Sequence, residues 1–338
     1  MINSCKTLFR RWRWVPLLAC LWPTISCAGG ENYAENPAAV ALVDQLVAEE
    51  GFDREALMAL MAEARRQESI LEAISRPAEK AKPWYDYRKI FLTPKRIDEG
   101  VEFYRQHRET LHRAEAKTGV PASIIVAIIG VETHYGRIMG SYRVLDALAT
   151  LAFDYPRRSE FFTSELRNYL ILTREQGMDP AVLKGSYAGA MGYGQFMPSS
   201  YRSYAVDFDA DGTADIWDNP VDAIGSVANY FKAHGWTPGA TVVVPARRER
   251  DVPADMFSEG RSLQPRYTIA EVTAAGLIPR ALVAADEEAI ALDFELEDGH
   301  EYWLGLNNFY VITRYNHSAK YAMSVYQLSE EIAAGVAQ

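Results

Sequence analysis

The sequence predicts a mainly helical α+β protein. Apolar residues recur at helical spacing over most of the chain, whereas the alternation typical of strands is confined to residues 240–312. The chain has 338 residues, 49% of them hydrophobic, so it can bury a large core and form two or three subdomains. We expect a helical subdomain at 36–85, a helical core at 86–239, a small β subdomain at 240–312, and a C-terminal segment at 313–338 that returns to the core or the helical subdomain.

The first 27 residues have the pattern of a secretory signal peptide. A basic region reaches Arg13, a short apolar run follows, and small residues surround Cys27. Cleavage before Cys27 would leave a cysteine for lipidation, whereas cleavage after Ala28 would give a soluble exported protein. The cysteines of the chain all lie at or before this point: Cys5, Cys20 and Cys27. The mature chain is therefore expected to have no internal disulfide and no thiol chemistry.

The charge balance argues against a nucleic-acid partner. The formal net charge is −10, and because the first 27 residues carry four basic residues and no acidic one, the rest of the chain carries −14. A surface this acidic repels phosphate backbones, and no basic stripe offsets it.

Helix signals mark the N-terminal segment. A first helix begins at Asn36-Pro37 and ends at Gly51, Asp53 caps a second one, and a shorter helical piece covers residues 70–74. No chemistry is expected in this segment.

An aromatic cluster precedes the core: Trp84, Tyr85 and Tyr87. Such a cluster usually packs in a hydrophobic core, but flat aromatic rings also stack on sugars. Tyr87 is therefore kept as a candidate ligand-binding residue. Thr93-Pro94 then starts a longer helix that is expected to run to Gly119.

Residues 119–136, GVPASIIVAIIGVETHYG, form the centre of the chain. Pro121 suits a first helical turn, and Gly136 suits a left-handed stop. Almost every residue from 124 to 131 is apolar, so this helix has no wet face and should run through a core. Glu132 sits near its C-terminal end.

Burial and the negative pole of a helix C-terminus both disfavour an ionised carboxylate, so they should raise the pKa of Glu132. A carboxylic acid that stays protonated near neutral pH is what general acid catalysis requires. The alternative is a solvated glutamate beside a core stripe, and the stretch by itself does not decide between the two.

Residues 185–201, GSYAGAMGYGQFMPSSY, form a second informative stretch. Four glycines among aromatic residues let the backbone approach a ligand closely, with Ser186 and Gln195 at the wall of a site. Upstream, the neighbouring pair Arg157 and Arg158 is either a solvated helix cap or a carboxylate-binding pair.

Residues 207–218, DFDADGTADIWD, match the opening of a Ca²⁺-binding EF-hand loop. Carboxylates occupy positions one, three and five, and glycine occupies position six. Position twelve is Asp218 rather than glutamate, and Asp222 is the alternative residue to close the site. Oxygen ligands favour Ca²⁺ over Zn²⁺, whereas the other interpretation is a solvated acidic turn.

Residues 240–312 change to strand-like alternation, with an Asp298-Gly299 turn, and the run FYVITRYN at 309–316 is included in these hairpins. A final helix is expected from about Ser318.

Four motifs together resemble the membrane-bound lytic murein transglycosylase B family: GVETHYG, the glycine-rich stretch, the Asp-rich loop and the terminal YNHSAKYA. The resemblance covers nearly the whole chain from about residue 37. It implies a lysozyme-like core in the periplasm, free or anchored to the outer membrane through Cys27. It also implies non-hydrolytic cleavage of the MurNAc–GlcNAc β-1,4 bond of peptidoglycan, which leaves a 1,6-anhydromuramoyl end. The implied partners are glycan strands with peptide stems and other cell-wall enzymes.

The same resemblance implies roles for individual residues. Glu132 matches the sole catalytic acid/base. Residues that match the sugar-contacting wall and the cleft lining are Ser186, Gln195, Tyr230, Tyr315, Asn316 and Tyr321. Arg157 and Arg158 match a pair that meets the peptide stem. The residues that match a structural calcium loop are Asp207, Asp209, Asp211, Thr213 through its carbonyl, and Asp222. Asn219 looks like an insertion in that loop, so the part played by Asp222 is open.

A single acid is consistent with this mechanism, because ordinary glycosidases need a second carboxylate across the scissile bond. Asp146 and Asp154 occupy polar, helix-capping contexts and are not expected to serve. Two other functions stay open: a hydrolytic muramidase and a non-catalytic peptidoglycan-binding protein. A calcium sensor is disfavoured, because there is one loop and no Met-rich groove.

Overall fold

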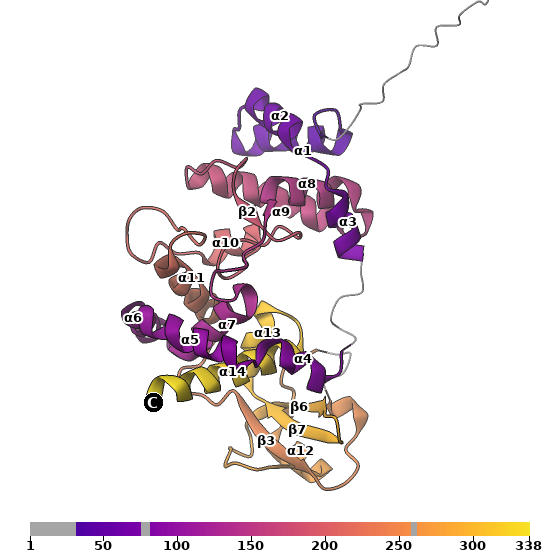
Figure 1. The fold of residues 1–338 in the computed structure, drawn as a ribbon. Coiled ribbons are helices and arrows are strands. Elements are labelled where there is room, and N and C mark those ends of the chain that lie inside the picture. The colour runs from indigo at the N-terminus through magenta and orange to yellow at the C-terminus, as the bar shows by residue number, and fades with distance from the viewer. Residues whose placement is uncertain (1–31, 76–81, 258–261) are drawn as a thin grey trace, which may run out of the picture. The chain divides into compact units, whose positions relative to one another are not determined.

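The computed structural model describes residues 32–75, 82–257 and 262–338 (Figure 1). The expected signal peptide and the lipidation of Cys27 lie outside the described residues. Within those residues, no single helix is long and apolar enough to cross a membrane. The bent pair Arg108–Thr118 and Ala122–Thr133 passes the same test of length and composition when taken together.

The chain begins with three helices, α1 (Pro37–Glu50), α2 (Arg54–Glu63) and α3 (Glu68–Ser75). The predicted caps are present: the Asn36 side chain accepts from the backbone N–H groups of residues 38 and 39, and Asp53 accepts from that of residue 56. The apolar stripes of these helices join one hydrophobic cluster with α8 (Val144–Asp154) and α9 (Ser159–Glu175).

Polar contacts from α8 fix this N-terminal segment in place. Asp146 is buried, and its carboxylate accepts from Arg143 at 2.8 and 2.9 Å and from the backbone N–H of Arg65 at 2.8 Å. Asp154 accepts from the hydroxyl of Tyr33 at 2.6 Å. Both acids therefore have polar surroundings, as expected, and their partners join α8 to the N-terminal segment.

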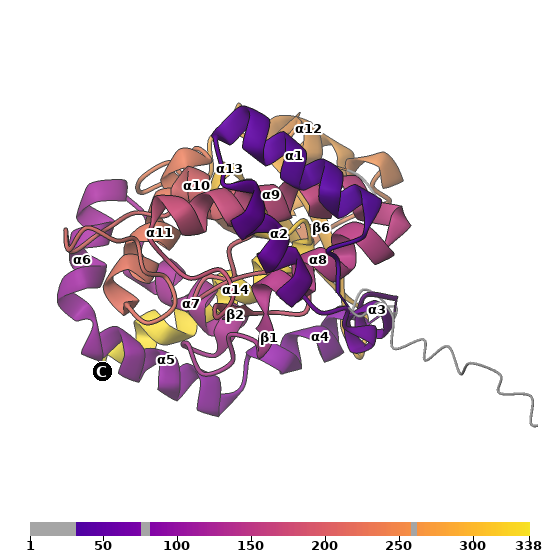
Figure 2. The ribbon, with the colours of Figure 1, turned by 90° about the horizontal axis from the view of Figure 1, so that it is seen from above.

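A second hydrophobic cluster surrounds the central helix α7 (Ala122–Thr133), which is buried on all sides over residues 124–130. The helices α4 (Trp84–Phe91), α5 (Pro94–Gln106), α6 (Arg108–Thr118) and α11 (Pro220–Ala233) contribute to this cluster. The C-terminal helix α14 (Ala319–Ala337) packs against α5 and α7, with Ser318 as its N-cap (Figures 1 and 2).

The single helix expected from Pro94 to Gly119 is wrong, because the chain breaks at His107 into α5 and α6. His107 has φ −111° and ψ 22°, outside the helical region, and its ring packs on Phe103 with centroids 4.5 Å apart. The sequence has no proline or glycine there, so the local composition gives no break signal.

Short elements connect these helices. They are β1 (Tyr142–Arg143), the 3₁₀ turn η2 (Pro156–Arg158), β2 (Lys184–Gly185) and α10 (Pro198–Tyr204). β1 and β2 pair antiparallel, with Tyr142 opposite Gly185.

Strands β3 to β7 form one antiparallel sheet in the order β4-β6-β7-β3-β5. They are β3 (Val243–Arg248), β4 (Tyr267–Thr268), β5 (Leu277–Pro279), β6 (Glu288–Glu295) and β7 (His300–Gly305). One face joins the cluster around α7 through Leu292 and Phe294. The other forms a separate cluster with α12 (Ile269–Ala275), and the short turn η3 (Ala254–Met256) lies in the connection from β3 to β4.

Residues 309–315 are not a strand, as the alternation had suggested, but belong to α13 (Asn307–Tyr315), and Asn316 is the C-cap of that helix. Phe309 and Ile312 are spaced three apart, and both are fully buried. The Asn308 side chain accepts from the Thr237 N–H at 2.8 Å and donates to its carbonyl, which fixes the start of the helix. A short apolar run allows either structure, and tertiary contacts decide it here.

Candidate active site

Glu132 lies in the last turn of α7, and an unusual turn follows it. His134, Tyr135 and Gly136 all have positive φ, at 53°, 59° and 84°. The left-handed stop predicted at Gly136 therefore begins two residues earlier, at side chains for which this region costs free energy. The Thr133 side chain stabilises this turn, because its hydroxyl accepts a hydrogen bond from the N–H of Gly136 at 3.0 Å and donates one to the Tyr193 carbonyl at 2.9 Å.

The environment of Glu132 raises its pKa to about 7, as the sequence predicted. The cause is desolvation, since protein surrounds the carboxyl, although the residue as a whole is partly exposed. The hydroxyl of Tyr321 donates to Oε1 at 2.6 Å, and this hydrogen bond acts in the opposite direction. An acid with a pKa near neutrality can give up a proton and later take one back, as a single acid/base must.

The tyrosines expected at the cleft converge near this acid. Tyr321 is buried on α14, and Tyr315 at the end of α13 donates to the Gly194 carbonyl at 2.6 Å. Burial raises the pKa of both phenols well above the usual value, and the charge of Glu132 adds to the effect. Tyr87 also acts electrostatically on Tyr321, while its ring packs between Trp84 and Phe91.

Of the two remaining residues expected at the cleft, Tyr230 is buried and Asn316 is exposed. The Tyr230 hydroxyl donates to the Arg314 carbonyl at 2.6 Å and its ring stacks on His234, so its polar atom is already engaged. Asn316 is exposed directly after α13.

The glycine-rich stretch lies against the loop that follows Glu132. Gly140 has φ 96°, and a Cβ there would lie 2.0 Å from the Gly185 carbonyl oxygen, so the two backbones are in contact. Gln195 spans the same junction, because its Nε2 donates to the carbonyls of Met139 at 3.2 Å and Gly192 at 3.0 Å. These contacts bring the 185–196 stretch to the Glu132 turn.

Ser186 stands at the start of that stretch and is partly exposed. Its Oγ accepts from the backbone N–H groups of Ala188 at 3.3 Å and Ala190 at 3.0 Å. The hydroxyl proton is left to donate elsewhere.

Arg157 and Arg158 are both exposed in η2. The guanidinium of Arg158 lies over the ring of Phe161 at 4.2 Å, and no contact joins the pair to Glu132 among the described residues. Their predicted part in ligand binding stays a prediction.

Sequence reasoning missed a charged network beside Glu132. Glu99 of α5 pairs with both His134 and Arg137, and Arg96 lies 3.4 Å from the other ring nitrogen of His134. Partial burial would raise the pKa of Glu99, but hydrogen bonds from Arg137 and His134 lower it. The network holds the left-handed turn against α5. Its only sequence signal was the polar pair His134 and Arg137 next to the acid.

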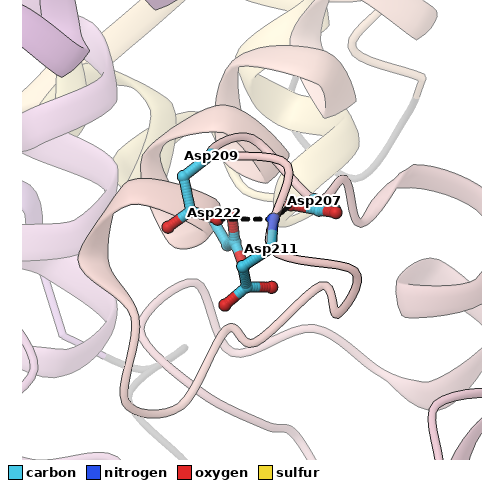
Figure 3. A group of neighbouring side chains, drawn as sticks. All are labelled: Asp207, Asp209, Asp211 and Asp222. Carbon is cyan, nitrogen blue, oxygen red and sulfur yellow. Dashed lines mark hydrogen bonds between the residues drawn. The ribbon is translucent and has the colours of Figure 1, made fainter.

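Four carboxylates form the only cluster of potential metal ligands among the described residues, as Figure 3 shows. They are Asp207, Asp209, Asp211 and Asp222, with one oxygen from each within 4.8 Å of the others. Asp222 is fully buried, whereas the other three are exposed. Asp218 is outside the group.

Asp222 also organises the loop. Its two oxygens accept the N–H groups of Phe208 at 2.7 Å and Asp215 at 2.9 Å. Burial, with the charges of Asp209 and Asp207, raises its pKa. Asn219 caps α11 and donates to Asp209 at 2.8 Å, and Asp222 belongs to the cluster with Asn219 in this position. An all-oxygen set of four negative charges fits Ca²⁺.

Residues 35–330 match the family model described as Transglycosylase SLT domain. The chain is 48% identical over 313 residues to membrane-bound lytic murein transglycosylase B of Escherichia coli (strain K12), covering 90% of this chain and 85% of that protein.

Solved structures of lytic transglycosylases also have the fold of this chain. Catenated lytic transglycosylase SltB1 of Pseudomonas aeruginosa superposes with a TM-score of 0.87 at 52% identity, over 90% of this chain and 100% of that one. The E. coli lytic transglycosylase Slt35 in complex with calcium gives 0.83 at 48% identity, over 91% and 96%. P. aeruginosa SltB3 in complex with NAG-anhNAM-pentapeptide gives 0.74 at 33% identity, over 87% and 78%.

Proposed function

The chain belongs to the transglycosylase SLT domain family and is a peptidoglycan lytic transglycosylase, and from this premise we propose that Glu132 is its single catalytic acid/base. Family membership makes the protein an enzyme, so the non-catalytic alternative falls away. The observation that carries the proposal is the carboxyl of Glu132, held near neutral pKa by burial and oriented by Tyr321.

The reaction starts with Glu132 protonated. Its proton passes to the GlcNAc oxygen of the glycosidic bond while that bond to the MurNAc anomeric carbon breaks. The carbonyl oxygen of the MurNAc N-acetyl group bonds to the anomeric carbon in its place. Glu132, now ionised, takes the proton of the MurNAc C6 hydroxyl, and O6 displaces the acetamido oxygen to close the 1,6-anhydro ring. Glu132 ends protonated, ready for another cycle.

The partners of the other candidate acids support one catalytic acid rather than two. The carboxylate of Asp146 is hydrogen-bonded to Arg143, and that of Asp154 is hydrogen-bonded to Tyr33. Glu99 forms ion pairs with His134 and Arg137. Hydrolysis with water would need a free carboxylate across the bond.

The walls of the site contribute polar atoms to the sugar. Ser186 donates its free hydroxyl proton to the N-acetyl group or a ring hydroxyl. Gln195 is fixed by its Nε2, so its carbonyl oxygen is the atom that it offers. Tyr87, Tyr315 and Asn316 complete the lining, whereas Tyr230 supports Tyr315 from behind, with ring centroids 4.7 Å apart.

We further propose that Asp207, Asp209, Asp211 and Asp222 bind Ca²⁺, together with the carbonyl of Thr213. The calcium complex of the related E. coli enzyme supports this assignment. The ion would neutralise the repulsion of the cluster and brace the loop before α11, a structural part rather than a chemical one.

The proposed substrate is a glycan strand with peptide stems, since the related SltB3 is in complex with such a fragment. We place the mature protein in the periplasm, in keeping with the membrane-bound name of its relative. Mass spectrometry of the mature N-terminus separates lipidation at Cys27 from cleavage after Ala28.

Mass spectrometry of the soluble products from purified peptidoglycan tests the reaction. Anhydro ends make each product about one water lighter than its hydrolysed counterpart, and Glu132→Gln should release none. Reducing ends would instead mean a hydrolase with a second carboxylate. Substantial activity in Glu132→Gln would remove Glu132 from the mechanism.

A further inference from the structure

One face of the five-stranded sheet is covered by α4 over only part of its width. The ring of Trp84 packs on Phe294 of β6 with centroids 4.8 Å apart, and its indole N–H donates to Glu301 of β7 at 2.6 Å. Glu301 also borders a cavity of about 370 Å³, together with other residues of β3 and β7 and with Arg280, just after β5. This volume suits a small ligand.

The strand register gathers cationic and aromatic side chains at this cavity. Pro245 of β3 is paired with Trp303 of β7, and its carbonyl accepts from the N–H of Arg280, just after β5, at 2.7 Å. Residues opposite one another in antiparallel strands share a face, so these three lie in one row. Arg247, two residues along β3, lies on the same face. All four border the cavity.

The charges here are partly balanced by acids. Arg247 pairs with Glu249, Arg248 pairs with Asp251 at 2.8 Å, and Glu301 accepts from Trp84. Arg280 is exposed and has no ion-pair partner in the described part of the chain. Arg280 and the indole-bearing Trp303 therefore border the same cavity, in a chain whose formal net charge is −10.

We propose that this cavity is a second substrate-binding site, which takes a carboxylate of a peptidoglycan peptide stem. The guanidinium of Arg280 binds the carboxylate with two parallel N–H···O hydrogen bonds, in the bidentate geometry typical of arginine. Arg247 adds a second positive charge, and Trp303 provides an apolar surface for the peptide. The inference rests on the proposed function, because that function supplies a substrate with such stems. It adds a stem contact separate from Arg157 and Arg158.

The position makes this contact useful. Trp84 borders the covered part of the sheet, and three residues later the same helix carries Tyr87, which acts on Tyr321 beside Glu132. A stem held at the sheet would therefore keep the peptidoglycan close to the catalytic site between cleavage events.

Titration calorimetry of the full chain carrying Glu132→Gln tests the site without turnover. The probes are a free stem tetrapeptide, the same peptide with its carboxylates amidated, and a peptide-free GlcNAc tetramer. We expect the tetrapeptide to bind, and Arg280→Gln to weaken it roughly tenfold, which is typical for loss of one charge-assisted hydrogen bond. The amidated peptide should bind more weakly and be insensitive to Arg280→Gln.

Arg108→Gln on α6 is the matched control, since it removes the same charge from another exposed arginine. It should leave tetrapeptide binding unchanged. Equal tetrapeptide affinity with and without Arg280, or no tetrapeptide binding at all, would overturn the proposal. Failure of the catalytic proposal would show separately, as absence of anhydro products from the wild type.

Discussion

The hydrogen bond from Tyr321 to Glu132 can be tested by Tyr321→Phe. The bond is 2.6 Å long and involves a carboxylate in a largely desolvated site, so its loss should cost about 1.5–3 kcal/mol in the ionised form. One pKa unit corresponds to about 1.36 kcal/mol. The bond stabilises the charged carboxylate, so its removal should raise the pKa of Glu132 above its present value of about 7 by at least one unit.

The consequence for activity follows from the protonation state that starts the reaction. Because Glu132 must be protonated to donate, kcat/KM falls as pH rises through its pKa. In Tyr321→Phe this basic limb should move up by about one pH unit. The plateau should also fall, because the carboxyl loses an orienting contact.

The assay is the initial rate of soluble product release from purified peptidoglycan, measured across about pH 4 to 9. Tyr326→Phe, a half-buried tyrosine further along α14, is the control and should leave the profile in place. A basic limb that stayed in place or moved to lower pH in Tyr321→Phe would refute the assigned direction of this hydrogen bond.

Three further predictions concern stability. Glu132→Gln should raise the free energy of unfolding by about 3 kcal/mol at pH 8 and by little at pH 4, because the folded-state pKa of about 7 exceeds the unfolded value. In the wild type, the loss of stability from ionising Glu132 grows as pH rises from its unfolded-state pKa to its folded-state pKa. Denaturant melts in which the wild type and the variant differ in unfolding free energy by the same amount at both pH values would contradict this. Asp146→Ala should cost about 2–3 kcal/mol, since it leaves the backbone N–H of Arg65 without its acceptor while Arg143 keeps its pairing with Glu63, and a loss under 1 kcal/mol would show that the Asp146 contacts are dispensable. Chelation should lower the melting temperature by several degrees, reversibly with Ca²⁺ but not with Mg²⁺; a chelator effect that persists in Asp207→Asn would place the ion elsewhere.

Much of the helical fold could be predicted because its signals are local. An all-apolar stretch marked α7 as buried, and the same stretch placed Glu132 where desolvation would raise its pKa. The caps at Asn36 and Asp53 also followed from local chemistry. Each of these signals lies within a few residues of the feature that it specifies.

Most of the misses depend on contacts between distant segments. The sequence placed α13 among the strands because its short apolar run fits both patterns. The hydrogen bonds that fix the start of this helix join Asn308 to Thr237, which are 71 residues apart in the sequence. The break at His107 and the pairing of Glu99 with His134 likewise depend on packing. The buried position of Asp146 depends on its contact with the backbone of Arg65, which lies 81 residues away in the sequence.

The metal loop shows the same division. The spacing of Asp207, Asp209 and Asp211 predicted a shared site, but the choice between Asp218 and Asp222 needed the start of α11. In the structure, Asp222 joins the cluster from the first turn of that helix.

The left-handed turn after Glu132 limits how this protein could be improved by selection for heat resistance. Two non-glycine residues there each cost roughly 1–2 kcal/mol, which glycine would recover in part. A library screened only for melting temperature would favour His134→Gly wherever the recovered backbone free energy exceeds the loss of the ion pair with Glu99. Such a screen would enrich variants with a higher melting temperature in which the turn after Glu132 is less well fixed. Directed evolution of this scaffold therefore needs an activity screen in every round.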